Sequence, residues 1–258
     1  MVVFDFMNIY KLKKFEIISI LLIIIAEILL FSGQRLLTIV VHSLNIILIL
    51  ILILSKKKSK IIQSLSLVSL LRIVYISLPV FVSFTIYWLA YLYLIMFIPI
   101  ILLIKEQRLS YSYIGLTFKN LYLLPISILL GIGLALLEYV ILVPNPLIPE
   151  PNIPNLFLLA IIMIFFIGLV EELIFRSLLQ QSIEENSGSM VGLLLSSVIF
   201  GFMNSGYSSH YAILYAIFVG LILGFSFQKT RNLPFVVMAH GVNNIFLFGI
   251  LPFVTQSQ

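Results

Sequence analysis

Long apolar runs dominate the sequence, and only short polar breaks interrupt them. About 20 residues of helix cross the hydrocarbon of a membrane, and a soluble domain carries roughly a quarter charged residues. This chain is 62% hydrophobic and 10% charged, which excludes a soluble fold, and its runs are too long and unbroken for barrel strands. We therefore predict an all-α, polytopic helical transmembrane bundle of eight or nine spans. They lie near residues 15–33, 36–54, 61–79, 81–104, 121–143, 156–181, 190–203, 211–227 and 235–254.

The basic residues predict how this bundle lies in the membrane. All of the 15 Lys and Arg residues except Arg35, Arg72 and Arg176 fall in alternate breaks, if the N-terminus is inside. Because cytoplasmic loops carry the excess of Lys and Arg, we expect an integral protein of the cell membrane with the N-terminus inside. With nine spans, the C-terminus lies outside. The residues predicted inside are Lys11, Lys13, Lys14, Lys56, Lys57, Lys58, Lys60, Lys105, Arg108, Lys119, Lys229 and Arg231.

The composition also limits which partners and which catalytic groups the protein can use. The formal charge of +5 comes from loops beside apolar spans, where it orients the protein, so we expect the lipid bilayer and no nucleic acid as a partner. The chain has no cysteine, which excludes thiolate nucleophiles and zinc sites built on sulfur. Catalysis, if present, must use Glu, His, Asn, Ser or Tyr.

Ionisable residues inside the spans are costly, and they fall into two kinds. Four are scattered singly, and we interpret them as interhelical pairs or hydrogen bonds; they are Glu27, His42, Arg72 and Glu138. Glu171, Glu172 and Arg176 are instead clustered in GLVEELIFRSLLQ. Three charges cost roughly 8 to 10 kcal/mol on insertion scales, so this span needs partners or a wet cavity.

Helical spacing separates the roles within the cluster. Glu172 and Arg176 are four residues apart with the acid first, which predicts an ion pair that serves architecture. Glu171 lies roughly 140° from Arg176 around the helix axis, so its carboxylate is free to meet water or substrate. A purely architectural charge cluster is the alternative.

The last span supplies a second pair in AHGVNNIF. His240 and Asn244 are four residues apart and share one helix face, where they can donate to a developing oxyanion. We place His240 about 8 Å and Glu171 about 15 Å from the inner ends of their helices. We therefore expect Glu171, Asn204, His240 and Asn244 to converge on one cavity that opens to the inner side.

These motifs carry a family resemblance. EExxxR at Glu171, Glu172 and Arg176, then SSVIFGFMN, then HxxxN at His240 and Asn244 resemble the CAAX-protease and bacteriocin-processing (CPBP, Abi) family of intramembrane proteases. The resemblance covers roughly residues 121–254. EExxxR inside a span is fairly specific, whereas HxxxN alone would be weak.

The resemblance implies a glutamate-dependent peptidase of the type II CAAX prenyl endopeptidase kind. Glu171 would polarise the attacking water, Glu172 and Arg176 would orient it, and His240 and Asn244 would stabilise the oxyanion. The substrate would be a membrane-associated or prenylated peptide or protein, cut near its C-terminus. The family leaves a divalent metal such as zinc open, although the three-histidine pattern of a confident zinc site is missing.

One position departs from the family pattern. The family's second motif is FxxxH, but here Phe200 is followed by Asn204, which can position water and cannot take its proton. His210 is a conceivable substitute, but we expect it to be a surface loop residue. The alternative to a protease is therefore a non-catalytic immunity or scaffold protein that binds peptide in the same cavity, with a proton-relaying transporter as a third candidate.

These patterns divide the chain in two. Residues 121–258 form the predicted protease-like core, which carries the three motifs. Residues 1–120 supply spans to which the sequence assigns no role.

Overall fold

The computed structural model describes residues 11–81, 86–117 and 120–255, and helices dominate all three ranges. The longer helices follow the predicted runs closely. Their bounds are α1 Lys14–Phe31, α2 Arg35–Leu54, α3 Lys60–Phe81, α4 Ile86–Glu106, α5 Leu124–Leu142, α9 Ser189–Phe202 and α10 His210–Thr230. The shorter ones are α6 Ile153–Ile161, α7 Leu169–Glu172, α8 Gln181–Ser187, α11 Leu233–Ile245 and α12 Leu251–Thr255.

Two rods are assembled from several of these helices. The π-helical segments Ile162–Gly168 and Leu173–Gln180 join α6, α7 and α8 into one rod, which we call the central rod. A third π-helical segment, Phe246–Ile250, joins α11 to α12. In the described residues, eight helical stretches are long and apolar enough to cross a membrane. The protein is an integral membrane protein with a polytopic helical fold, as predicted.

Apolar side chains cover the outside of the bundle. Leu54, Val140 and Ile98 are among the many large aliphatic residues that remain exposed, with 82%, 80% and 63% of their surface accessible. In water such a surface would drive aggregation, whereas in lipid it costs nothing. The exposed aliphatic belt therefore fits a protein that faces hydrocarbon.

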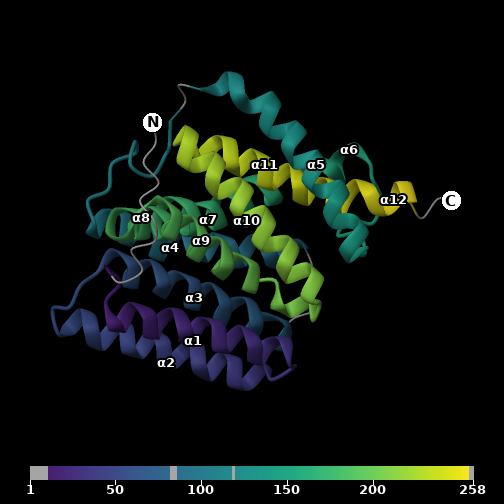
Figure 1. Cartoon of the computed structure of the whole chain (residues 1–258). Helices are drawn as coiled ribbons and strands as arrows, with labels where there is room; N and C mark the ends of the chain where they lie inside the picture. The colour runs from purple at the N-terminus through teal and green to yellow at the C-terminus, as the bar shows by residue number, and fades with distance from the viewer. Residues whose placement is uncertain (1–10, 82–85, 118–119, 256–258) are drawn as a thin grey trace.

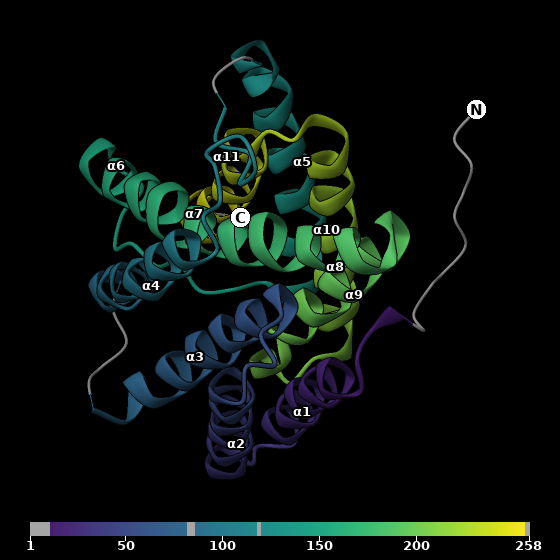
Figure 2. The ribbon, with the colours of Figure 1, turned by 90° about the vertical axis from the view of Figure 1, so that its left-hand side faces the viewer.

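The rods lie side by side, with the central rod between two groups of helices (Figures 1 and 2). On one side lie α1, α2 and α3, and on the other lie α5 and α11. The central rod packs against α3, α4, α9 and α11, so helices from the whole chain surround it. Polar side chains of the central rod can therefore meet side chains from several other helices, as a functional site requires.

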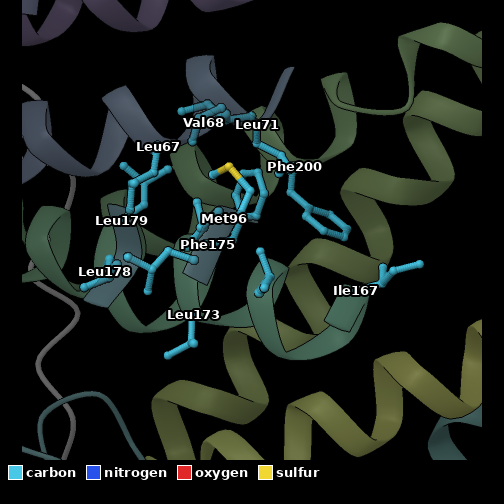
Figure 3. Packing of buried hydrophobic residues seen from close by; sticks show 14 of the residues in the cluster. Leu67, Val68, Leu71, Met96, Ile167, Leu173, Phe175, Leu178, Leu179 and Phe200 are labelled. Carbon is cyan, nitrogen blue, oxygen red and sulfur yellow. The ribbon is translucent and has the colours of Figure 1, made fainter. Parts of the chain in front are cut away.

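Apolar packing fixes the rod against the N-terminal helices. Figure 3 shows Leu71 of α3, Met96 of α4 and Phe200 of α9 around Phe175 of the central rod. Phe175 and Met96 are fully buried, and the rings of Phe175 and Phe200 meet edge to face at 5.1 Å. The ring quadrupoles favour this edge-to-face contact. The packing therefore holds the central rod in place against α9, close to the charged residues of the rod.

A glycine sets the distance between α5 and α11. A Cβ atom on Gly131 would lie 2.5 Å from the carbonyl oxygen of Ala239, closer than real Cβ contacts allow. Gly133 on the same helix has open space around it. Close approach at Gly131 brings Glu138, farther along α5, next to Asn243 of α11, whose Nδ2 donates to Glu138 at 2.7 Å.

Candidate functional site

The three clustered charges lie where the central rod changes its winding. Glu171 and Glu172 end the short helix α7, which has a π-helical segment on each side, and Arg176 lies in the second of these segments. π-helical turns are uncommon and occur frequently at functional sites. The irregular winding thus coincides with the motif that the sequence analysis selected.

Glu172 and Arg176 form the predicted ion pair. Nε of Arg176 lies 2.9 Å from Oε2 of Glu172, and both side chains are fully buried. The guanidinium also lies 4.7 Å from the centre of the Phe200 ring. Its two terminal nitrogens have no hydrogen-bond partner among the residues that the structure describes, so the aromatic face and Glu172 stabilise the charge.

Glu172 has a second contact, which the sequence did not predict. Its Oε1 lies 2.8 Å from Nδ1 of His240 on α11. When Nδ1 carries a proton it donates to this carboxylate, and the other ring nitrogen is left to face the cavity. Glu172 therefore orients His240, whereas the resemblance had implied that it orients Glu171 or its water.

Glu171 and His240 face each other across the site. Nε2 of His240 lies 3.8 Å from Oε2 of Glu171. The other carboxylate oxygen of Glu171, Oε1, accepts a short hydrogen bond from the hydroxyl of Tyr93. Tyr93 belongs to α4, so the N-terminal half of the chain, which had no predicted role, contributes a side chain to the site.

One cavity of about 750 Å³ contains the predicted site residues that are not in the ion pair. Its lining includes Glu171, Asn204, His240 and Asn244, which come from the two rods and the turn after α9. The structure therefore brings these four residues together, while Glu172 and Arg176 lie buried behind the cavity wall. Their catalytic roles stay predictions.

Asn204 lies just after α9, at the position of the missing histidine. Its Nδ2 lies 3.5 Å from the carbonyl oxygen of Phe200, the limit of a hydrogen bond. The Phe200 ring itself meets the His240 ring edge to face at 5.9 Å. The FxxxN motif thus contributes the Phe200 ring to the wall of the site and the Asn204 amide to the cavity.

The expected depth and opening of the site need correction. The central rod continues to Ser187, so Glu171 lies roughly 24 Å from that end at 1.5 Å per residue, farther than the predicted 15 Å. The cavity is lined by Gly33, Asn145 and Ser208, from the loops at the other end of the bundle. This end is opposite to the Lys- and Arg-rich loops that were expected inside, so the lining does not match the expected opening to the inner side.

The four scattered ionisable residues are paired, as interpreted. The Arg72 guanidinium donates to both carboxylate oxygens of Glu27, at 2.6 and 2.5 Å, and Nε2 of His42 lies 3.3 Å from the same carboxylate. Ser205 donates to Glu27 at 2.6 Å, which ties α1 and α3 to the turn after α9. Arg72 also lines the cavity, as does Glu138, and sequence spacing gave no signal for either.

His210 does not substitute for the missing histidine. It is exposed at the first position of α10, and its ring centre lies 4.5 Å from that of Phe31. It is absent from the residues that line the cavity. The interpretation of His210 as a surface residue is confirmed.

The side chains present do not fit a zinc site. A catalytic zinc ion takes three protein ligands, usually His, Glu, Asp or Cys. No group of three such residues among the described residues is arranged to hold a metal ion, because Glu172 and Nδ1 of His240 are engaged with each other.

Comparison with known proteins bears on the class of the protein. Residues 153–246 match the family model described as "Rce1-like: Type II CAAX prenyl endopeptidase Rce1-like". This segment is similar to that family. The match spans all three motifs and confirms the resemblance, and no curated protein and no solved structure matches the chain. A CAAX-type family match on a polytopic membrane bundle supports an intramembrane protease at the level of reaction class.

Proposed function

We propose that this protein is an intramembrane peptidase in which Glu171 is the general base. The observation that carries the proposal is the 3.8 Å separation between Oε2 of Glu171 and Nε2 of His240 in one shared cavity. A water about 2.8 Å from both atoms can bridge this separation. A carboxylate and an imidazole, both able to accept and release a proton, therefore meet at one point of the cavity.

The reaction follows from these positions. Glu171 takes a proton from the water as its oxygen attacks the peptide carbonyl carbon. Protonated His240 and the amide of Asn244 donate to the oxyanion that forms. The C–N bond then breaks, and Glu171 returns the proton to the leaving amine, which yields a carboxylate and an amine.

Neighbouring residues hold the reacting groups in place. Tyr93 occupies Oε1 of Glu171, so Oε2 is left for the water. Glu172 holds His240 through Nδ1, and Arg176 balances the charge of Glu172. Glu171 and Glu172 ionised, with Arg176 and His240 protonated, sum to zero, which suits a site removed from water.

The proposed substrate is a membrane-associated peptide or protein, cut near its C-terminus. A cavity of about 750 Å³ is large enough for several side chains of an extended segment. That this substrate is prenylated is implied only by the family's description. Whether a prenylated substrate can reach the cavity depends on the side of the membrane from which substrate enters.

Glu171→Gln tests the proposal. Glutamine keeps the shape of the side chain and loses its basicity, so cleavage of a fluorogenic membrane-anchored peptide should fall by about 10² to 10⁴. The variant should elute as a folded protein in detergent. Glu106→Gln is the matched control, because Glu106 is exposed and pairs with Lys58 far from the site, and it should keep the parent rate. An active Glu171→Gln variant would exclude the proposed role.

A non-catalytic scaffold is the second candidate, and Asn204 favours it. With an amide at this position, the cavity has one titratable group fewer than the family pattern provides. A scaffold would bind the same peptide with unchanged affinity in the parent and in Glu171→Gln, and neither would cut it. Binding and cleavage assays on the two proteins separate the candidates.

A further inference from the structure

The cavity reaches the surface at one end of the bundle, which we call the mouth end. Its lining includes Gly33 after α1, Arg35 at the start of α2, Asn145 after α5, and Tyr207 and Ser208 between α9 and α10. These loops lie at the same end of the bundle, because α1, α5 and α9 end there and α2 and α10 begin there. Among the residues that the structure describes, none from the loops at the other end lines the cavity.

The other end of the bundle is basic. Between them, the described loops and helix ends there carry Lys11, Lys13, Lys14, Lys56, Lys57, Lys58, Lys60, Lys105, Arg108, Lys229 and Arg231, while Lys119 lies outside the described residues. In the described part of the mouth end, Arg35 is the one Lys or Arg residue. Short loops rich in Lys and Arg stay in the cytoplasm, so the mouth end faces the opposite side.

The basic end is also closed over the site. The loop that follows α4 is tied down by three hydrogen bonds. Ser177 donates to the carbonyl of Ile114 at 2.6 Å, Gln181 donates to that of Tyr113 at 2.6 Å, and the amide of Leu233 donates to Gly115 at 2.7 Å. These bonds fasten the loop to the central rod and to the start of α11.

Gly115 and two ion pairs tighten this closure. Gly115 has φ +75°, and a Cβ atom there would come within 2.7 Å of the fully buried Phe227 ring. Lys60 pairs with Glu185 at 2.9 Å, and Arg231 pairs with Glu184 at 2.6 Å. A second pocket lies at this basic end, but none of its lining residues also lines the site cavity. A peptide approaching from the basic side therefore meets this separate pocket, whereas from the mouth side it meets the cavity. The lining of the second pocket is Tyr113, Gln181, Glu184, Glu185, Ser189 and Arg231.

We infer that the protein takes its substrate from the non-cytoplasmic side of the membrane. The inference rests on the proposed peptidase function and names its substrate class: an exported or outer-leaflet-anchored peptide segment. A prenylated tail held at the cytoplasmic leaflet would face the closed end. The family's description and the geometry of this chain thus imply different substrates.

Cysteine labelling tests the sidedness, because the chain has no cysteine of its own. Asn145→Cys places a thiol at the mouth, and Ser55→Cys places one at the basic end, after α2; both positions are exposed. In intact cells, a membrane-impermeant maleimide should label Asn145→Cys, and Ser55→Cys should react only after permeabilisation. Labelling of Ser55→Cys in intact cells, or protection of Asn145→Cys, would overturn the inference.

Sealed vesicles test the entry of substrate separately. Right-side-out vesicles should cleave an added water-soluble reporter peptide, and inside-out vesicles, in which the mouth end faces the lumen, should lose most of this cleavage. Faster cleavage by inside-out vesicles would overturn the inference. If neither preparation cleaves while detergent-solubilised protein is also inactive, the peptidase function fails, and the labelling pattern still decides the sidedness.

Discussion

Nδ1 of His240 lies 2.8 Å from Oε1 of Glu172, and this contact joins the helix of the EExxxR motif to the helix of the HxxxN motif. The same carboxylate pairs with Arg176. Glu172 thus bridges a cation on its own rod and an imidazole on another. Fully buried charges cost several kcal/mol each unless paired, so the two partners explain how Glu172 is tolerated there.

Removing the cation should therefore destabilise the fold. Arg176→Ala leaves the Glu172 carboxylate buried beside His240 alone, and breaking a buried pair costs about 3 to 5 kcal/mol. We expect a lower yield of monodisperse protein and a lower midpoint of thermal unfolding in detergent. Lys60→Ala is the control, because the Lys60–Glu185 pair is about half exposed, and such pairs contribute about 1 kcal/mol or less. Equal stability of the two variants would contradict the architectural role of Arg176.

Tyr93 should be needed for the rate more than for the fold. Tyr93→Phe removes the hydroxyl that holds Oε1 of Glu171, and a hydrogen bond to a charged group contributes about 1.5 to 3 kcal/mol. If that bond orients the base, kcat should fall roughly 10- to 100-fold. Tyr91→Phe, on the exposed face of the same helix, should leave kcat unchanged. A loss confined to KM, or none at all, would show that Tyr93 does not position the base.

Two glycines on α5 form a matched pair for a test of packing. Gly131→Ala forces α5 away from the backbone of α11, and such overpacking costs about 1 to 3 kcal/mol. Gly133→Ala meets open space and should stabilise the helix by up to about 1 kcal/mol. Opposite shifts of the thermal midpoint are the expected result. A stabilised Gly131→Ala variant would mean that the two helices do not pack as closely as described.

The sequence predicted the helices and the local part of the site, because both depend on short-range spacing. The apolar runs determined the spans, and the i, i+4 spacing determined the pair of Glu172 with Arg176. Tyr93 could not be found in this way, since a tyrosine among the apolar residues of α4 has no spacing that points to Glu171. Its role depends on how two distant helices pack.

That loops of the mouth end line the cavity could not be predicted, for a related reason. The depth of His240 was judged from its own helix, and that helix does begin at the basic end. Which end is open depends instead on whether loops close over it. The hydrogen bonds from Ser177 and Gln181 to the loop after α4 join residues more than 60 positions apart, and no local pattern predicts them.

The departure from the family pattern gives the last prediction. If an amide at position 204 limits the reaction, Asn204→His should raise the rate of cleavage without disturbing the fold. The Asn204 side chain lines the cavity, and among the described residues it makes one marginal hydrogen bond. An imidazole can accept the proton of the attacking water, and a well-placed base contributes about 10² to 10⁴ in rate. We expect a rise of at least about tenfold in cleavage of a fluorogenic membrane-anchored peptide, below the lower limit of that range. The double variant with Glu171→Gln should lose the gain. A lower rate in Asn204→His than in an efficient parent would show that Asn204 itself serves the reaction, and inactivity of both proteins would favour the scaffold.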